Sequence, residues 1–325
     1  MNYLLKRILI SIVVFVVVIN LVFVLPRLVP GNAADILASG SKVPAQDVKV
    51  IEARLGLNQP VTTQYALFLK NMFSWPPYFG VSYLYYPATV SSLFLVRIGW
   101  TLLLSALSFL FGVTLAYAFT SYSSLRRGGK FEIGALYTAI IFNSTPIFWV
   151  ALLLLWIFSV HLGWFPLFGN LGFNPGSGIN YWGTLLWHVV LPVITLGMSL
   201  YGESYLLLRG SVQEVLKSDY VLAARSRGLR DRILSLRYIL RNSMLPLVSV
   251  LSFSLASLIS RVVLVEAVFG YPGVGDLIVD AVGGRDYPVL QGSLFYLTLM
   301  IIVGGLMGDF LMTRLDPRLR IPEVS

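Results

Sequence analysis

The chain has 325 residues, of which 57% are hydrophobic and only 12% are charged. Because soluble domains carry about a quarter charged residues, this composition favours a membrane protein. The sequence contains no cysteine, which excludes disulfide bonds, thiolate chemistry and Cys-ligated metal sites.

Six apolar segments predict an all-α protein with six transmembrane helices. Each segment reaches about the 20 residues that a helix needs to cross about 30 Å of hydrocarbon. The segments lie at 8–26, 98–125, 133–160, 185–208, 243–268 and 287–308. Residues 133–202 contain no Lys, Arg, Asp or Glu, but the stretch 161–183 is rich in Gly, Pro and Asn. This stretch predicts a turn that separates the third span from the fourth.

Basic residues are concentrated in the segments that would face one side of the membrane. Residues 209–242, between the fourth and fifth spans, hold eight Lys or Arg against three Asp or Glu. Further basic residues precede the first span, follow the second and end the chain: Lys6, Arg7, Arg126, Arg127, Lys130, Arg314, Arg318 and Arg320. Since Lys and Arg mark the cytoplasmic side, both termini are predicted to be cytoplasmic. This pattern also explains the net charge of +9 without nucleic-acid binding.

The segment between the first two spans, residues 28–96, is the only sizeable part outside the predicted spans. The first span itself is longer than the core of a typical signal peptide and lacks a following Ala-x-Ala site, so we expect a retained anchor. Apolar residues of 28–96 recur at helical spacing, which predicts short amphipathic helices. These residues are Val48, Ile51, Leu55, Tyr65, Phe68, Leu69 and Met72. The helices form either a packed cap or a docking surface.

The stretch "DYVLAARSRGL", residues 219–229, predicts a helix that ends at a glycine. Ala223 and Ala224 are small enough for another backbone to approach closely. Gly228 adopts the left-handed conformation at low cost, so the helix ends there.

A second helix is predicted over the stretch that follows, residues 229–242, because Ile233, Leu236 and Leu240 share one helical face. The pattern fits two structures equally well. One is a helical projection that docks on a cytoplasmic partner, and the other is a solvated basic loop held by lipid head groups.

Charged residues within the spans are candidates for a functional site, because they are costly in a bilayer. Arg261 lies about 27 Å along the fifth span at 1.5 Å per residue, near its outer end, whereas Glu203 lies near the inner end of the fourth span. We therefore expect these two residues not to pair, and Glu203 to meet the basic inner surface at Arg209. Arg261 either points into a polar pathway or snorkels outward. Glu266 is five residues further on, a poor spacing for a pair on one helix face.

Other chemistry is sparse. His161 and His188 are far apart and lack the spacing of metal ligands, so no metal site is predicted. The phosphate-binding pattern G-x-x-x-x-G-K-[ST] is absent from the sequence. We predict no catalytic site.

Four stretches, in collinear order, resemble the permease subunits of ABC importers of the dipeptide/oligopeptide type, in the subgroup of the first permease. "AARSRG" (223–228) is similar to their EAA motif, although Leu222 stands where the broad motif has Glu. "VEAVFGYPGVGDLIVDAVGGRDYPVLQG" (265–292) resembles their outer signature. The other two stretches are "LVPGNAADIL…RLGLNQPVTTQYALFL" near the start and "DPRLR" (316–320). "YFGVSY" (78–83) replaces the usual Gly-Asp-Leu-Gly.

The resemblance implies a type I importer fold and assigns residues to three roles. The residues implied in ATPase coupling are Asp219, Tyr220, Ala223, Ala224, Arg225, Arg227, Gly228 and Leu229. Those of the outer signature are Phe269, Pro272, Gly273, Gly275, Arg285, Asp286, Tyr287 and Pro288. Arg261 and Glu266 are the candidates for the translocation pathway.

The implied function is that of a permease subunit that carries peptides across the plasma membrane. Oligosaccharides or another solute remain alternative cargoes. A secondary transporter or channel acting alone is the rival class, but we find neither the inverted repeats nor the midplane ion ligands of such transporters.

The implied partners are a second, homologous permease, two ATP-binding subunits and an extracellular solute-binding protein. ATP and Mg²⁺ would bind to the ATPase partners, and no cofactor to this chain. The expected organisation is an anchor with an extracellular segment at 1–96, a permease core at 97–313 with its coupling loop at about 209–242, and a cytoplasmic tail at 314–325.

Overall fold

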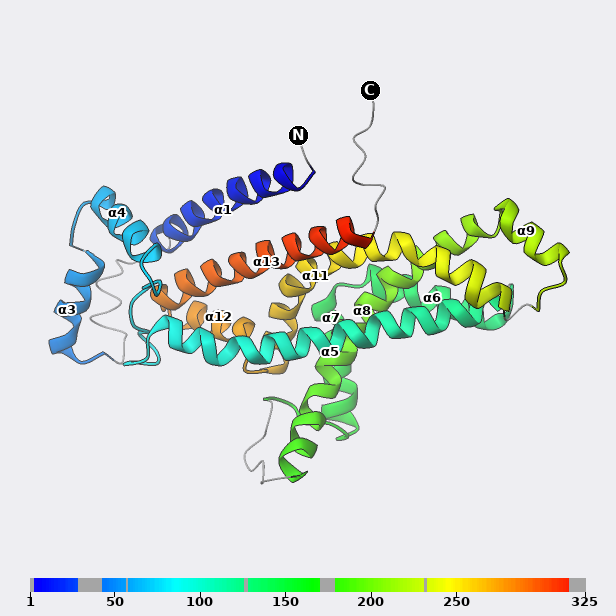
Figure 1. Ribbon diagram of the computed structural model, residues 1–325. Coiled ribbons are helices and arrows are strands. Elements are labelled where there is room, and N and C mark those ends of the chain that lie inside the picture. The colour runs from blue at the N-terminus through cyan, green and yellow to red at the C-terminus, as the bar shows by residue number, and fades with distance from the viewer. Residues whose placement is uncertain are drawn as a thin grey trace. The chain divides into compact units, whose positions relative to one another are not determined.

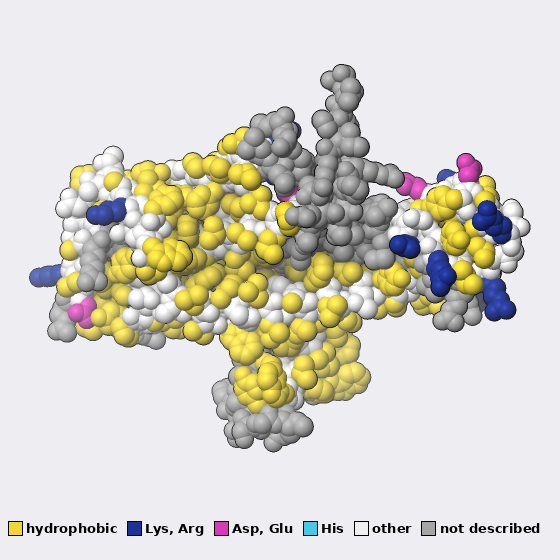
Figure 2. Space-filling model, in the orientation of Figure 1, with side chains coloured by type: hydrophobic (Ala, Val, Ile, Leu, Met, Phe, Trp, Pro, Cys, Tyr) yellow, Lys and Arg dark blue, Asp and Glu magenta, His cyan; other side chains and the backbone are white. Residues whose placement is uncertain are grey.

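The computed structural model describes residues 3–28, 43–56, 58–125, 128–169, 179–230 and 233–315, and these are mostly helical (Figure 1). Four of the helices are long and apolar enough to cross a membrane, or six if each of two bent helix pairs counts as one span. The predicted all-α membrane architecture is confirmed. Accordingly, hydrophobic side chains cover much of the face seen in Figure 2.

The long helices follow the predicted spans and exceed several of them. They are α1 (Tyr3–Leu28), α5 (Val90–Leu125), α8 (Ile179–Val215), α11 (Arg241–Phe269) and α13 (Tyr287–Leu315). α8 has 37 residues, about 55 Å at 1.5 Å per residue, so it is longer than the hydrocarbon core is thick. The basic residues at 126–127 and the "DPRLR" stretch at 316–320 lie outside the described residues.

The third predicted span differs from the structure, because two helices replace the single one. α6 (Lys130–Ser144) and α7 (Ile147–Leu154), which continues into the π-helix η1 (Leu155–His161), meet at 109°. Thr145 between them is extended, with φ −86° and ψ 131°. The residue before a proline avoids the helical region, and proline has no N–H to donate, so Pro146 accounts for the break.

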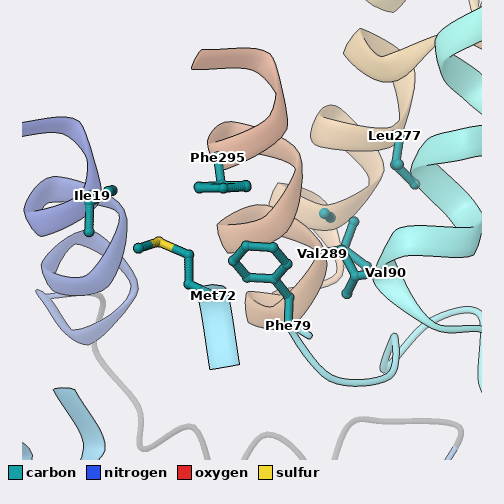
Figure 3. Packing of buried hydrophobic residues seen from close by; sticks show 8 residues of the cluster. Ile19, Met72, Phe79, Val90, Leu277, Val289 and Phe295 are labelled. Carbon is teal, nitrogen blue, oxygen red and sulfur yellow. The ribbon is translucent and has the colours of Figure 1, made fainter. Parts of the chain in front are cut away.

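Contacts divide the chain into two compact units. One unit comprises residues 7–102 and 272–302, and the other 1–6, 103–271 and 303–325. In the first unit, a core joins α1, α4 (Val61–Met72), α5, α12 (Val274–Gly283) and α13 (Figure 3). Ile19, Met72, Phe79, Val289 and Phe295 are among its buried members.

The helices predicted between the first two spans are confirmed as α3 (Ala45–Leu55) and α4. Val48 and Ile51 of α3 are buried in a cluster with Tyr83 and Tyr287. Met72 of α4 is buried in the core of the same unit. The apolar sides of both helices are therefore used in packing, as a cap requires.

In the second unit, α5, α6 and α8 pack around a cluster that contains Ala116, Ala139 and Tyr201. Small residues bring these helices close together. A Cβ on Gly112 of α5 would lie 2.5 Å from the carbonyl oxygen of Gly197 of α8, so a larger residue does not fit. Such glycine contacts are typical of helices that pack within a membrane.

Candidate functional site

The segment expected to contact an ATPase is a short helix, α9 (Asp219–Ser226), fixed to its own chain by one side. Val221 and Ala224 are buried on that side. They pack in a cluster with Val212 at the end of α8 and with buried residues of the returning chain: Leu234, Ile239 and Leu240. Three consecutive elements thus share one small core, so α9 is not a solvated loop.

The opposite side of α9 is exposed. Asp219, Leu222, Ala223 and Ser226 lie there, and 53% of Leu222 is accessible. The two alanines lie on different sides of α9. Ala223 is exposed, whereas Ala224 is 4% exposed because it faces the protein's own core.

The remaining residues implied in coupling also lie in or beside α9. Tyr220, Arg225 and Arg227 are exposed, and Leu229 packs against the edge of the cluster below α9. Figure 2 shows Lys and Arg side chains gathered over the end of the unit that carries α9.

Gly228 ends this segment as predicted. Its φ is +73°, in the left-handed region that favours glycine. The N–H of Arg227 donates to the carbonyl oxygen of Ala223 at 3.2 Å, and the N–H of Gly228 donates to that of Arg225 at 3.0 Å. The backbone therefore turns sharply after one short helix.

The predicted face of the second helix is confirmed at Leu240, which is buried, but it is wrong at Ile233, which is 40% exposed. Leu234 and Ile239 are buried as well, and the side chain of Leu236 lies outside the described residues. The reason is that residues 234–240 form a π-helix, η2 (Leu234–Leu240), which leads directly into α11. In a π-helix, residues five apart share a face, and a pattern read at three and seven misses the buried pair.

Arg261 of α11 and Glu203 of α8 form an ion pair, contrary to the sequence-based expectation. Arg261 Nη2 donates to Glu203 Oε2 at 3.1 Å, and Arg261 Nη1 donates to Ser199 Oγ at 3.3 Å. Both helices run past the span ends assumed from sequence, to Val215 in α8 and back to Leu234 through η2. The sequence-based positions of Arg261 and Glu203 across the membrane were therefore counted from span ends that are not the true helix ends.

Arg209, the partner expected for Glu203, pairs instead with Glu132. Arg209 Nη2 lies 3.0 Å from Glu132 Oε1, which fixes the start of α6 to α8. Glu132 Oε2 also accepts the N–H of Gly128 at 2.8 Å, next to the loop between α5 and α6. On α8, Arg209 lies six residues beyond Glu203, about 9 Å along the helix, so the two ion pairs of α8 are separate.

The outer signature joins α11 to α12 and α12 to α13. Phe269 is buried, and Gly270 ends α11 with φ 55°. The N–H of Tyr271 returns to the carbonyl oxygen of Glu266 at 2.9 Å. Glu266 is fully buried, and the carboxylate that pairs with Arg261 is that of Glu203.

The other signature residues shape the ends of α12 within one unit. Gly273 precedes α12 and Gly275 lies in its first turn, both buried, with Pro272 half-buried beside them. The first N–H of α12, that of Val274, donates to Thr101 Oγ1 at 2.9 Å. At the other end, exposed Arg285 has a positive φ of 52°, and Tyr287 and Pro288 are buried at the start of α13.

Asp286 is the central residue of this outer region. Its carboxylate accepts hydrogen bonds from Ser82 Oγ, from the N–H of Tyr83 at 2.8 Å, from that of Leu84 at 3.0 Å and from that of Val289 at 3.2 Å. Burial raises the pKa of Asp286, and these hydrogen bonds oppose that shift. No pattern in the sequence indicates this contact, because Ser82 lies 204 residues away.

Two further outer contacts were also missed. Arg97 Nη1 donates to Asp276 Oδ2 at 2.8 Å, and the Tyr85 hydroxyl donates to Asp280. Burial and the hydrogen bond to Asp280 raise the pKa of Tyr85 to about 12. Both contacts hold α12 to the chain before or within α5.

The described residues show no arrangement for metal binding, since no three His, Asp or Glu side chains come together. The ring of His161 stacks on Trp156, and His188 Nδ1 lies 2.8 Å from the carbonyl oxygen of Thr184. Both histidines thus have structural partners.

Comparison with known proteins decides which class of membrane protein this is. Residues 108–321, which include α9, Glu203, Arg261 and the outer signature, match the family described as the inner membrane component of binding-protein-dependent transport systems. Residues 1–113 match the N-terminal region of the membrane component of such systems. The chain belongs to this family. It is therefore a multi-pass permease of the cell membrane with the type I ABC importer fold, and not itself an ATPase.

Several permeases are similar over nearly their whole length. The oligopeptide transport system permease protein AppB of Bacillus subtilis (strain 168) is 31% identical over 321 residues, which covers 98% of each chain. The di/tripeptide transport system permease protein DppB of Pseudomonas aeruginosa (strain UCBPP-PA14) is 31% identical over 335 residues, covering 98% of this permease and 99% of DppB. The probable peptide ABC transporter permease y4tP of Sinorhizobium fredii is 31% identical over 318 residues, covering 98% and 99%.

Proposed function

We propose that this chain forms part of the pathway through which an ATP-driven importer carries peptides into the cell. The observation that carries the choice of cargo is the full-length similarity to permeases named for oligopeptides and for di- and tripeptides. An oligosaccharide importer is the alternative. The only feature of the composition that would favour a sugar is the aromatic content, and aromatic residues at membrane interfaces explain that content equally well.

We further propose that α9 is the contact with an ATPase subunit. One side of α9 is fixed by Val221 and Ala224 to the end of α8 and to η2. The other side presents Leu222 and Ala223 to a partner. A force on α9 therefore passes directly to α8 and, through η2, to α11. Such rigid movement of helices is how alternating access is produced.

The complete transporter in this proposal contains a second, homologous permease, two ATP-binding subunits and an extracellular solute-binding protein. ATP and Mg²⁺ bind to the ATPase subunits. This chain contributes part of the pathway and the helices that move, and its partners supply the free energy of ATP hydrolysis.

Uptake by the purified complex tests the cargo. With the complex in liposomes and its binding protein outside, we expect ATP-dependent accumulation of labelled trialanine. An excess of unlabelled peptide should compete, and an excess of maltotriose should not. Competition by the sugar with no uptake of peptide would reverse the assignment.

The coupling role is tested by adding a charge to the exposed side of α9. Leu222→Arg places a large cation in the proposed interface, and we expect cargo-stimulated ATP hydrolysis to fall by about tenfold, as for a residue central to an interface. Val50→Arg on α3 is the matched control, because Val50 is 52% exposed and Leu222 is 53% exposed. Equal hydrolysis by the two variants would show that α9 is not the contact.

A further inference from the structure

The Arg261–Glu203 pair stands out because it is charged, lies within membrane-crossing helices and is not sealed inside the protein. The side chains of Arg261 and Glu203 are 31% and 23% exposed. Arg261 is eight residues before the end of α11 at Phe269, about 12 Å along the helix, and both charged residues lie in stretches apolar enough to cross a membrane. Ionisable residues within such stretches mark functional sites, since a bilayer disfavours them strongly.

The turn of α8 that carries Glu203 also packs against the end of α6, next to the break between α6 and α7. A Cβ on Gly202 would lie 2.8 Å from the carbonyl oxygen of Ala139 and 2.9 Å from the amide nitrogen of Asn143, both in α6. α6 ends one residue after Asn143, and Asn143 itself is exposed. Broken helices at membrane depth are tolerated where they are buried in protein or line a water-filled cavity, and they frequently border the substrate sites of transporters.

The geometry of the pair leaves it able to exchange partners. One donor of Arg261 reaches one oxygen of Glu203, and a second donor reaches Ser199 at the long distance of 3.3 Å. This is not the two-pronged contact by which a guanidinium holds a carboxylate most strongly. A ligand carboxylate that offers both oxygens would therefore bind Arg261 better than Glu203 does.

We propose that Arg261 and Glu203 are a cargo-binding site that receives the two charged ends of a peptide. Arg261 binds the α-carboxylate, and Glu203 binds the α-ammonium group. This inference rests on the proposed peptide importer and specifies the part of the peptide that the membrane pathway recognises.

Charge balance explains why a peptide with free termini fits this pair. In the empty site the two side chains neutralise each other. A zwitterionic peptide replaces each partner by a group of the same charge, so neither side chain is left alone at membrane depth. A neutral oligosaccharide offers hydroxyl groups but cannot replace either charge. The termini of extended trialanine lie about 10 Å apart, at 3.3–3.6 Å per residue, so the two side chains must separate by several ångströms to admit it.

Thiol protection in the assembled transporter tests the proposal directly. The chain has no cysteine, so Ser199→Cys places a single thiol beside Arg261. In the purified complex without binding protein, we expect trialanine to slow the reaction of this thiol with a charged methanethiosulfonate reagent by several-fold. Trialanine that is acetylated and amidated should protect much less. Trp75→Cys, at a position that is 95% exposed and lies outside the proposed ATPase contact, is the control thiol that trialanine should leave unprotected.

Charge-removing variants identify the groups that bind. In the Ser199→Cys background, Arg261→Met should raise the concentration of trialanine needed for protection by about tenfold, the factor expected for a lost charge-assisted hydrogen bond, and Arg261→Lys by less. Glu203→Gln should have a similar effect. The double variant Arg261→Met with Glu203→Gln leaves no lone charge in the membrane, so it keeps the test valid if a single variant does not assemble.

The outcomes separate the two proposals. Equal protection by free and capped trialanine, or protection that survives in the double variant, overturns the cargo site while leaving peptide import intact. If the wild-type transporter takes up no peptide in liposomes, the proposed function itself fails.

Discussion

At the scale of single residues, Asp286 shows how one carboxylate organises the outer end of a unit. Its two oxygens accept four hydrogen bonds, three of them from residues 82–84. It follows Arg285, whose positive φ of 52° turns the chain between α12 and α13. The segment at 78–83 departs from the family pattern, but its Ser82 and Tyr83 still donate hydrogen bonds to Asp286 of the outer signature.

Removal of this carboxylate should destabilise the permease. Asp286→Ala leaves buried N–H and O–H donors without an acceptor, and each such group costs about 1–3 kcal/mol. We expect a lower midpoint of thermal unfolding in detergent, with Asp286→Asn intermediate because an amide offers one oxygen instead of two. Glu214→Ala, at an exposed acidic residue of α8, should leave the midpoint within error. An unchanged midpoint for Asp286→Ala would mean that water replaces the lost acceptor.

At the scale of elements, the end of α9 depends on a single backbone conformation. Gly228 has φ +73° and an N–H bonded to Arg225, with open space where a Cβ would be. Proline fixes φ near −65° and has no N–H, so Gly228→Pro should displace the end of α9 without disturbing membrane insertion. We expect transport and cargo-stimulated ATP hydrolysis to be lost.

Gly228→Asn is the matched control for that change, because asparagine tolerates the left-handed region. It should retain most of the stimulated hydrolysis, whereas Gly228→Val, strained by about 1–2 kcal/mol, should fall between the two. Full stimulated hydrolysis in Gly228→Pro would show that the end of α9 plays no part in coupling.

The sequence predicted those elements whose signal is local. Runs without charge located the membrane helices, because a bilayer excludes charged groups along about 20 residues. Helical spacing located α3 and α4, because each buries one apolar side. The break at Pro146 was also written locally, in "STP" at 144–146, but the long uncharged run concealed it. Proline after a polar pair was the signal that would have revealed two helices.

The contacts that the sequence missed depend on how helices align in space. The Arg261–Glu203 pair requires the true lengths of α8 and α11, which extend beyond the hydrophobic spans. The buried face of η2 requires knowledge of its π-helical winding. The partners of Asp286 lie about 200 residues away in the chain. None of these follows from spacing within a single segment.

At the scale of the whole molecule, the proposed mechanism requires a fixed orientation in the membrane. α9 must lie on the cytoplasmic side, where the ATPase is, and residues 28–96 must lie on the outer side of the membrane. The positive-inside pattern gives this orientation, since 209–242 is basic and the first span, which leads to residues 28–96, is preceded by Lys6 and Arg7. We therefore expect Arg227 on the cytoplasmic side of the membrane and Trp75 on the outer side.

Single cysteines measure this orientation without interference, because the chain contains none of its own. Trp75 is 95% exposed and Arg227 is also exposed, so a cysteine at either position is accessible to a reagent on its own side. In cells whose outer membrane or cell wall has been removed and whose cell membrane is intact, an impermeant maleimide should label Trp75→Cys. It should label Arg227→Cys only after the membrane is opened. Labelling of Arg227→Cys from outside would place α9 on the wrong side for any contact with an ATPase. No ATPase could then move α8 and α11 through α9.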